Sequence, residues 1–224
     1  MQNSIAKARA CQNEEQRSLV FGFVDSSERI DELVRRSILA YEARCPYVRI
    51  RVEKHDMHRA AELLRMGMLD IMFNSAIETD YLDDHGIPWE KVWDTNVCAY
   101  VPEKNSRFLR ERMELEDLKG SRLLSLDPLM HPSYKNWLDR LCESHGFSPD
   151  IAASFRTVRS LLFALKMQEH IFVGETITSE WCDASLKQFV FPEKSFTVLA
   201  WRRQGGKELL DFKNHLLNML ASGN

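Results

Sequence analysis

The stretch LLRMGMLDIMFNSA, residues 63–76, points most directly to the architecture of this chain. It starts in a helix-like pattern, passes Gly67, and continues as a short apolar run that stops at Asn74 and Ser75. A helix, a glycine and a buried-looking strand are typical of one unit of a parallel α/β sheet. Small molecules bind such sheets just beyond the carboxyl ends of the strands. The two polar residues therefore either face a ligand or begin a simple turn, which they also favour.

The segment before this stretch completes a strand-helix-strand-helix-strand pattern. Residues 18–24, SLVFGFV, form a β-leaning apolar run that ends at the polar turn DSSE. Residues 47–53, YVRIRVE, alternate apolar and charged side chains, as a strand with one wet face does. Between them Pro46 stops a helix whose apolar residues recur at helical spacing, namely Ile30, Leu33, Val34, Ile38 and Tyr41. Such units build parallel sheets with right-handed crossovers.

A second module of the same kind begins in the middle of the chain. Residues 81–89 are loop-like, and residues 96–103 are strand-like. Strands and helices then alternate again, followed by two further strands and an amphipathic helix. The expected strands are 121–127, 151–155, 170–174, 187–191 and 196–201, and the expected helices are 132–146, 157–168 and 206–220. The sequence therefore predicts an α/β fold with two halves of similar architecture.

Composition excludes several classes of function. The chain has 224 residues, 44% of them hydrophobic, which fits a packed globular protein. The chain contains 30 Lys and Arg residues and 33 Asp and Glu residues. The resulting net charge of −3 gives no electrostatic reason for the chain to bind phosphate backbones. Any contact with DNA would need another segment. Residues 1–16 lack the apolar core of a secretion signal and no run is long enough to span a bilayer, so we expect a cytoplasmic protein without membrane contact.

Candidates for metal binding or catalysis are weak. The motif HDMH, residues 55–58, has no third and fourth ligand by spacing and reads as a solvated helix cap. Ser26, Ser27 and Cys98 lack a glycine-flanked nucleophile elbow or a recognisable paired base. We therefore expect no metal, no cofactor and no enzymatic activity. The cysteines lie far apart without a CxxC pair, which argues against a disulfide framework and a thiolate metal site: Cys11, Cys45, Cys98, Cys142 and Cys182.

Four predicted strand ends carry small polar groups that face helix starts. Helix starts present unpaired N–H groups, so several such ends together favour a ligand site. Ser26, Ser27 and Thr157 also suit plain helix capping, because Ser and Thr are preferred there with or without a ligand. The four ends are residues 25–27, Asn74 with Ser75, residues 127–133 and residues 154–157.

Two further features near these ends have alternative interpretations. His131 beside Asp127 is either a polar clamp on a ligand or part of a surface loop. Arg156 and Arg159 either neutralise an anionic ligand or lie in solvent, as charged residues near helix starts commonly do.

From Ser18 to about Leu220 the chain resembles the effector-binding domain of LysR-type transcriptional regulators. Residues 4–10, SIAKARA, are also similar to the end of the linker helix that joins this domain to a winged helix-turn-helix in the family. Order and spacing over the whole chain carry the resemblance, because the family has no invariant catalytic motif. The matching pieces are LVFGFVDSS, ILAYEARCPYVRIRV, ELLRMGMLDIMF, VWDTNVCAYVP, LEDLKGSRLLSLDP, WLDRLCESHGFSPDIAASFRTVRSLLFAL and LAWRRQGGKELLDFKNHL.

The resemblance implies two Rossmann-like subdomains of the periplasmic-binding-protein type II architecture, with an effector cleft between them. After a leader of residues 1–17, subdomain I would contain residues 18–95 and 180–224, and subdomain II residues 96–179. The chain would cross between them near Thr95 to Val97 and return near Glu175 to Glu180.

The resemblance also implies where an effector binds. Positions in the first loop, at the end of the third strand, and at two helix starts of the opposite subdomain would face the cleft. Met57 departs from the family, which often has a hydroxyl residue there, and Arg35 replaces a usual proline. We expect a small-molecule effector, either a small carboxylate or an aromatic acid. The expected ligand-binding residues are Ser26, Ser27, Asn74, Ser75, Asp127, His131, Pro132, Ser133, Tyr134 and Thr157.

The resemblance implies the partners as well. The domain would form a homodimer or homotetramer, in which residues 30–41 of one subunit lie antiparallel to residues 209–220 of another. Contact with DNA would come only through a helix-turn-helix domain outside these residues. A stand-alone solute-binding protein of a transport system and a small enzyme share the same scaffold and remain alternatives, because fold alone does not set function.

Overall fold

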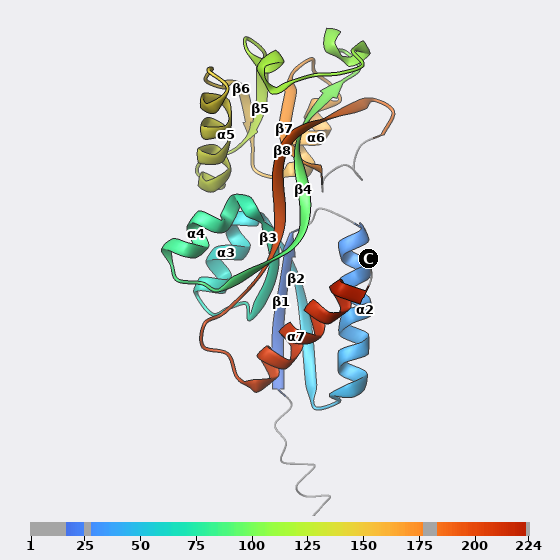
Figure 1. The fold of residues 1–224 in the computed structure, drawn as a ribbon, viewed down its shortest axis with the longest axis vertical. Coiled ribbons are helices and arrows are strands. Elements are labelled where there is room, and N and C mark those ends of the chain that lie inside the picture. The colour runs from blue at the N-terminus through green and yellow to red at the C-terminus, as the bar shows by residue number, and fades with distance from the viewer. Residues whose placement is uncertain (1–16, 25–27, 177–182, 223–224) are drawn as a thin grey trace, which may run out of the picture.

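The computed structural model describes residues 17–24, 28–176 and 183–222 of the chain (Figure 1). Two lobes lie one above the other in this view, and two long strands run vertically between them. The structure confirms the predicted mixed α/β fold, with eight strands in one sheet among the described residues. The strand order is β2-β1-β3-β8-β4-β7-β5-β6.

The first lobe, at the bottom of Figure 1, contains the predicted strand-helix-strand-helix-strand unit. Its strands pair in parallel, β1 with β2 and β1 with β3, as the crossover helices require. Helix α3 ends before Gly67, whose φ of 73° suits the left-handed position after a helix. The unit comprises β1 (Arg17–Val24), α2 (Glu28–Arg44), β2 (Val48–His55), α3 (Met57–Arg65) and β3 (Ile71–Ser75).

The second lobe repeats the pattern at the top of Figure 1. Strand β5 pairs in parallel with both β6 and β7. The helices leave these strands where the sequence predicts, although the helix expected at 157–168 is shorter. The lobe comprises η2 (Ser106–Leu109), η3 (Leu115–Leu118), β5 (Arg122–Leu126), α5 (Pro132–Ser144), β6 (Asp150–Phe155), α6 (Val158–Leu165) and β7 (Ile171–Glu175), where η marks a 3-10 helix.

Strands β4 (Trp89–Pro102) and β8 (Leu186–Trp201) join the lobes and pair antiparallel with each other. Their pairing shifts register between Asn96 and Cys98, at mid-length. Pro192 of β8 lies opposite this irregularity, where a residue without an N–H is tolerated. The sequence pattern predicted two strands, 187–191 and 196–201, because proline reads as a break. In the structure they are one strand.

One expected loop is partly regular structure. Residues 81–89 looked like a loop, but they contain most of the short helix α4 (Thr79–Asp84) and the start of β4 at Trp89.

The return of the chain to the first lobe was expected near residues 175–180. The segment 186–191 still packs in the second lobe, with Leu186, Phe189 and Phe191 in its core, so β8 crosses back at about residues 192–195.

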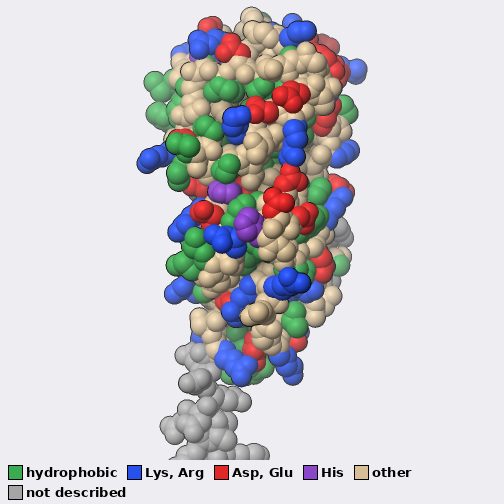
Figure 2. Space-filling model, turned by 90° about the vertical axis from the view of Figure 1, so that its left-hand side faces the viewer, with side chains coloured by type: hydrophobic (Ala, Val, Ile, Leu, Met, Phe, Trp, Pro, Cys, Tyr) green, Lys and Arg blue, Asp and Glu red, His purple; other side chains and the backbone are tan. Residues whose placement is uncertain are grey.

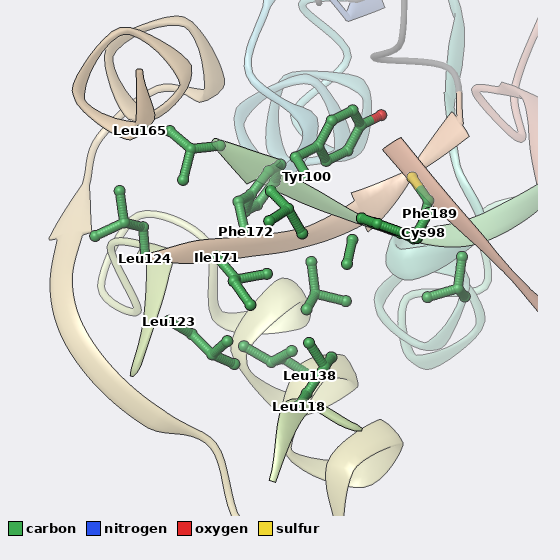
Figure 3. Close-up of a cluster of buried hydrophobic side chains, with 14 of the residues drawn as sticks. Cys98, Tyr100, Leu118, Leu123, Leu124, Leu138, Leu165, Ile171, Phe172 and Phe189 are labelled. Carbon is green, nitrogen blue, oxygen red and sulfur yellow. The ribbon is translucent and has the colours of Figure 1, made fainter. Parts of the chain in front are cut away.

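Each lobe has its own hydrophobic core. Figure 3 shows part of the second-lobe core, where Tyr100 and Phe172 stack above leucines of the sheet and helices. In the first lobe, α2 and α7 (Lys207–Ser222) cover one face of the sheet and α3 covers the other. The predicted apolar stripe of α7 is confirmed at Leu209, Phe212 and Leu216, all fully buried. Burial of such side chains contributes about 1.5–3 kcal/mol each.

On the face that carries α3, α4 and α5, acidic and basic side chains are interspersed (Figure 2). Within the described part of the chain, no helix is both long and apolar enough to cross a bilayer.

Candidate functional site

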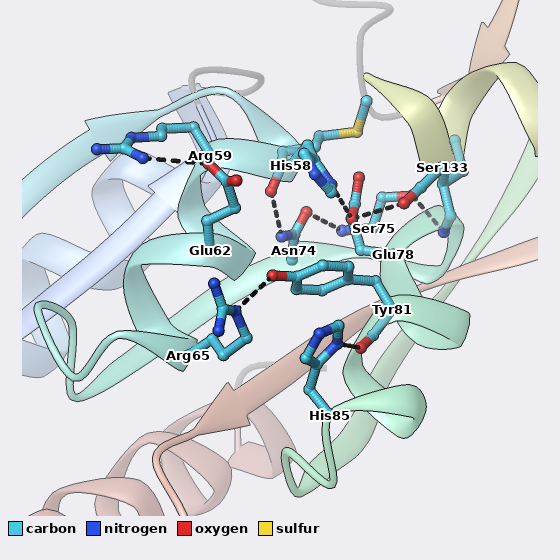
Figure 4. A network of polar contacts seen from close by, with 12 residues as sticks. His58, Arg59, Glu62, Arg65, Asn74, Ser75, Glu78, Tyr81, His85 and Ser133 are labelled. Carbon is cyan, nitrogen blue, oxygen red and sulfur yellow. Dashed lines mark hydrogen bonds and ion pairs between the residues drawn. The ribbon is translucent and has the colours of Figure 1, made fainter. Parts of the chain in front are cut away.

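The end of β3 lies where the two lobes meet, and its polar residues are buried. Asn74 donates from Nδ2 to the carbonyl oxygen of Met57 at 2.8 Å and accepts from the backbone N–H of Ser75 at 2.8 Å (Figure 4). Ser75 Oγ accepts from the backbone N–H of Ile77 at 3.0 Å and so caps the 3-10 helix η1 (Ala76–Glu78). The turn interpretation of both residues is therefore confirmed, while their position at the junction keeps the ligand interpretation open.

Glu78, at the end of η1, connects the lobes. Its side chain has no exposed surface, and its Oε2 accepts from Ser133 Oγ at 2.9 Å and from His58 Nδ1 at 3.1 Å (Figure 4). Ser133 belongs to α5 of the second lobe, so this bond crosses the junction. The hydrogen bond from His58 to Glu78 raises the pKa of that histidine, although its burial acts in the opposite direction. The other oxygen, Oε1, has no hydrogen-bond partner in the structure described.

A second buried carboxyl, Glu175, ends β7 at the same junction. The hydroxyls of Ser195 on β8 and Ser75 on β3 hydrogen-bond to it. Tyr100 of β4 donates from its hydroxyl to the backbone carbonyl of Glu175 at 2.6 Å, which holds the strand end in place. Burial raises the pKa of the Glu175 carboxyl, because the charged form loses its hydration.

Hydroxyl groups surround this carboxyl on one side of the sheet. Ser75 pairs with Thr197 across β3 and β8, and Thr95 pairs with Ser195 across β4 and β8. Paired residues point to the same side of a sheet, and so do residues two apart in a strand. Ser75, Thr95, Ser195 and Thr197, here called the junction hydroxyls, therefore share one face, and all four are buried.

The family of the chain follows from its sequence. The sequence model described as the LysR substrate binding domain matches residues 12–215. The chain belongs to this family. Membership makes it the effector-sensing domain of a LysR-type transcriptional regulator, and the family is one of regulators and not of enzymes. The predicted resemblance is thereby confirmed. A search among curated proteins finds no match.

Solved structures of LysR-type proteins share the fold. A full-length BenM mutant is 17% identical, with a TM-score of 0.72, and the match covers 99% of this chain and 74% of that one. The effector-binding domain of a BenM variant is also 17% identical, with a TM-score of 0.71, over 92% of this chain and 95% of that one. The LysR family regulator CbnR is 15% identical, with a TM-score of 0.67, over 97% and 74%. They support the periplasmic-binding-protein type II architecture.

The start of α5 in this LysR-type domain holds several of the expected residues. Pro132 is the first residue of α5, and Ser133 contacts Glu78 as described. His131 is only 2% exposed and its Nε2 donates to the carbonyl oxygen of Arg156 at 2.7 Å. The surface-loop interpretation of His131 is therefore wrong. Asp127 accepts from the backbone N–H of Leu129 at 2.9 Å and shapes the turn before the helix.

Other expected residues lie apart from the junction or have structural roles. The side chain of Tyr134 lies in the second-lobe core, where its hydroxyl donates to the carbonyl oxygen of Val173 at 2.8 Å. Thr157 caps α6 by accepting from the backbone N–H of Ser160 at 3.1 Å, as the capping interpretation predicts. Arg156 and Arg159 are exposed. Ser26 and Ser27 lie outside the described residues.

The side chains of the motif HDMH do not converge on one point. His55 Nε2 contacts Glu53 at 3.0 Å, whereas His58 contacts Glu78. Asp56 is the N-cap residue of α3. Among residues 17–24, 28–176 and 183–222 there is no group of three or more His, Cys, Asp and Glu side chains that could hold a metal ion.

Sequence reasoning missed Glu78 and Glu175, the two carboxyls at the junction. Glu175 ends an apolar run just as Asn74 does, so the rule that selected Asn74 would also have selected it. Glu78 has no such signal, because its partner Ser133 lies 55 residues away in sequence.

Proposed function

We propose that this domain binds a small-molecule effector where the two lobes meet, and that binding changes the relative position of the lobes. The observation that carries this proposal is the buried contact of Glu175 with Ser75 and Ser195. It brings together the carboxyl ends of β3 and β7, one from each lobe, which is where parallel α/β sheets bind ligands. A ligand that binds one lobe arrangement better than another shifts the equilibrium between them.

The effector is a small carboxylate or an aromatic acid. Capped strand ends at Ser75 and Thr157 support this class, because hydroxyls and helix starts suit an anionic group. The candidate ligand contacts are the residues expected from the sequence, together with Glu78 and Glu175. The side chain of Tyr134 is the exception, because it has a structural role.

The lobe movement reaches DNA through a helix-turn-helix domain that lies outside these residues. Strands β4 and β8 both pass between the lobes and supply the hinge at their register shift near Asn96. We assign the chain to the cytoplasm. In keeping with its family, it binds its ligand as a signal and does not convert the ligand to a product.

The domain assembles as a homodimer or homotetramer through the outer surface of the first lobe. Exposed apolar side chains support this surface: Leu39 on α2 is 55% exposed, Val52 on β2 is 41% exposed and Leu210 on α7 is 46% exposed. Strand β2 is also an edge of the sheet, and free edges invite pairing with another chain.

A thermal-shift screen of small carboxylates and aromatic acids tests the proposed function. A true effector at about 100 times its Kd stabilises the folded chain by about 2.7 kcal/mol. Ser75→Ala should weaken this stabilisation, whereas Ser144→Ala on the exposed end of α5 should not. The same compound should change the affinity of the full-length regulator for its operator DNA. Unchanged operator affinity would refute the switching part, and conversion of the compound to a product would favour an enzyme.

A further inference from the structure

We propose that the effector is an amino acid, whose ammonium group binds Glu175 among the junction hydroxyls. The inference rests on the proposed function, since it names the ligand class of the same site. The polar strand ends alone suggest only that the ligand is an acid. The inference adds a positively charged group to that ligand.

The position of the Glu175 carboxyl favours a ligand with several hydrogen-bond donors. It lies at the end of β7 between Ser195 of the hinge strand β8 and Ser75 of the first lobe. An ammonium group has three donors and no acceptor, so it matches one carboxyl and neighbouring hydroxyl oxygens. An amine that displaced Ser75 from Glu175 would exchange a bond between the lobes for a bond to the ligand. Binding would thereby be coupled to lobe movement.

Two buried oxygen atoms of residues at the junction have no hydrogen-bond partner among the described residues. Thr95 Oγ1, on the residue paired with Ser195, makes no hydrogen bond to any described residue. Glu78 Oε1, three residues after Ser75, is likewise unpaired within the described structure. Leaving a buried oxygen without a partner is costly, because its hydration is lost and nothing replaces it. Both can accept hydrogen bonds, so a donor group on a ligand would satisfy them.

The buried charges of the described residues also favour a cation at the junction. The buried acidic residues of the described chain are Asp70, Glu78 and Glu175, and no lysine or arginine among those residues is buried. Asp70 already pairs with Arg202 Nε at 2.7 Å, and Glu78 pairs with His58. Burial raises the pKa of Glu175, because its carboxylate form is poorly solvated there. A bound ammonium would supply the counter-charge that stabilises a buried carboxylate.

Calorimetric titration of matched compounds tests the inference on the intact chain. The probes are the twenty standard amino acids, and each one that binds is compared with its deaminated acid and its decarboxylated amine. Phenylalanine, 3-phenylpropionate and phenethylamine are one such set. We expect at least one amino acid to bind at least tenfold more tightly than both of its analogues.

Two variants assign this preference to a residue. Glu175→Gln, which keeps the shape but removes the charge, should reduce affinity for the amino acid at least tenfold and leave affinity for its deaminated acid within twofold. Glu103→Gln, at an exposed position on the second lobe, should change neither affinity. If Glu175→Gln does not fold, the comparison of analogues on the unmodified chain still decides the question.

The inference and the proposed function fail in different ways. If a deaminated acid binds as tightly as its amino acid, or if no amino acid binds, the inference is overturned. A carboxylate that still changes operator affinity would then leave the proposed function standing. If an amino acid binds with the expected preference but operator affinity stays constant, the ligand class holds and the switching proposal falls.

Discussion

Ser133 of the second lobe donates a hydrogen bond of 2.9 Å to the fully buried carboxylate of Glu78 in the first lobe. The bond closes the junction on the side that carries α3, α4 and α5. Met57 and Ile77 of the first lobe reinforce it, because both pack into the hydrophobic core of the second lobe. Arg140 of α5 and Asp80 of α4 add an exposed ion pair at 2.7 Å, which contributes little on its own.

Ser133→Ala should destabilise the chain by about 1–2 kcal/mol, because it leaves the Glu78 carboxylate with one hydrogen-bond donor fewer in a buried position. Urea unfolding of the variant measures this change. Ser144→Ala is the matched control, since Ser144 lies on the same helix but is exposed. Equal stability of the two variants would show that the bond across the junction is energetically unimportant.

His58 should make stability depend on pH. Its hydrogen bond to Glu78 raises its pKa in the folded chain, so its stabilising contribution is complete below the unfolded value of about 6.5. That contribution is lost as pH rises through the raised folded value. The difference in unfolding free energy between the natural chain and His58→Asn should therefore be larger at pH 6 than at pH 9. The exposed His85 provides the control His85→Asn, and a His58 difference that grew with pH would contradict the assignment.

Tyr134→Phe should lower the unfolding free energy by about 1–2 kcal/mol without changing effector affinity. The tyrosine hydroxyl bonds to the carbonyl of Val173 inside the core, and its loss removes this buried hydrogen bond. Urea unfolding and calorimetric titration with the same ligand separate the two effects. A loss of affinity larger than threefold, with stability unchanged, would restore Tyr134 to the ligand site.

Leu39→Lys should weaken self-association, because it places a charge in the apolar surface proposed for the dimer. Sedimentation velocity over a range of micromolar concentrations should show a shift toward monomer. Leu129→Lys is the control, at an exposed leucine in the second lobe. A natural chain that is already monomeric at these concentrations would argue against the proposed dimer surface.

Local patterns in the sequence predicted most of the fold because they are carried by neighbouring residues. Short runs of sequence are enough to recognise the strand that ends at Ser75, the glycine after α3 and the apolar stripe of α7. Helix α4 was missed because its six residues, TDYLDD, are polar enough to look like a loop. Strand β8 was predicted as two strands because Pro192 was taken as a break. The sequence does not show that the partner strand β4 is irregular at the same place.

The candidate site was predicted less completely, since its contacts join distant parts of the chain. Ser75 was found from its place at a strand end, yet its contact with Glu175 depends on how β7 and β8 meet across the sheet. Glu78 accepts a hydrogen bond from Ser133 of α5, which lies 55 residues later in the sequence. Tyr134 was expected to contact the ligand from its place at a helix start, and the sequence did not show that its hydroxyl bonds to the carbonyl of Val173 in the second-lobe core.

Hydrogen-exchange mass spectrometry, with and without the compound that most stabilises the chain, tests most directly whether the effector binds between the lobes. We expect slower exchange in residues 71–78, 171–176 and 189–197, which belong to both lobes and to the hinge. Ser75→Ala should reduce this protection. Protection confined to one lobe, or located on the outer surface of α2 and α7, would contradict a site at the junction.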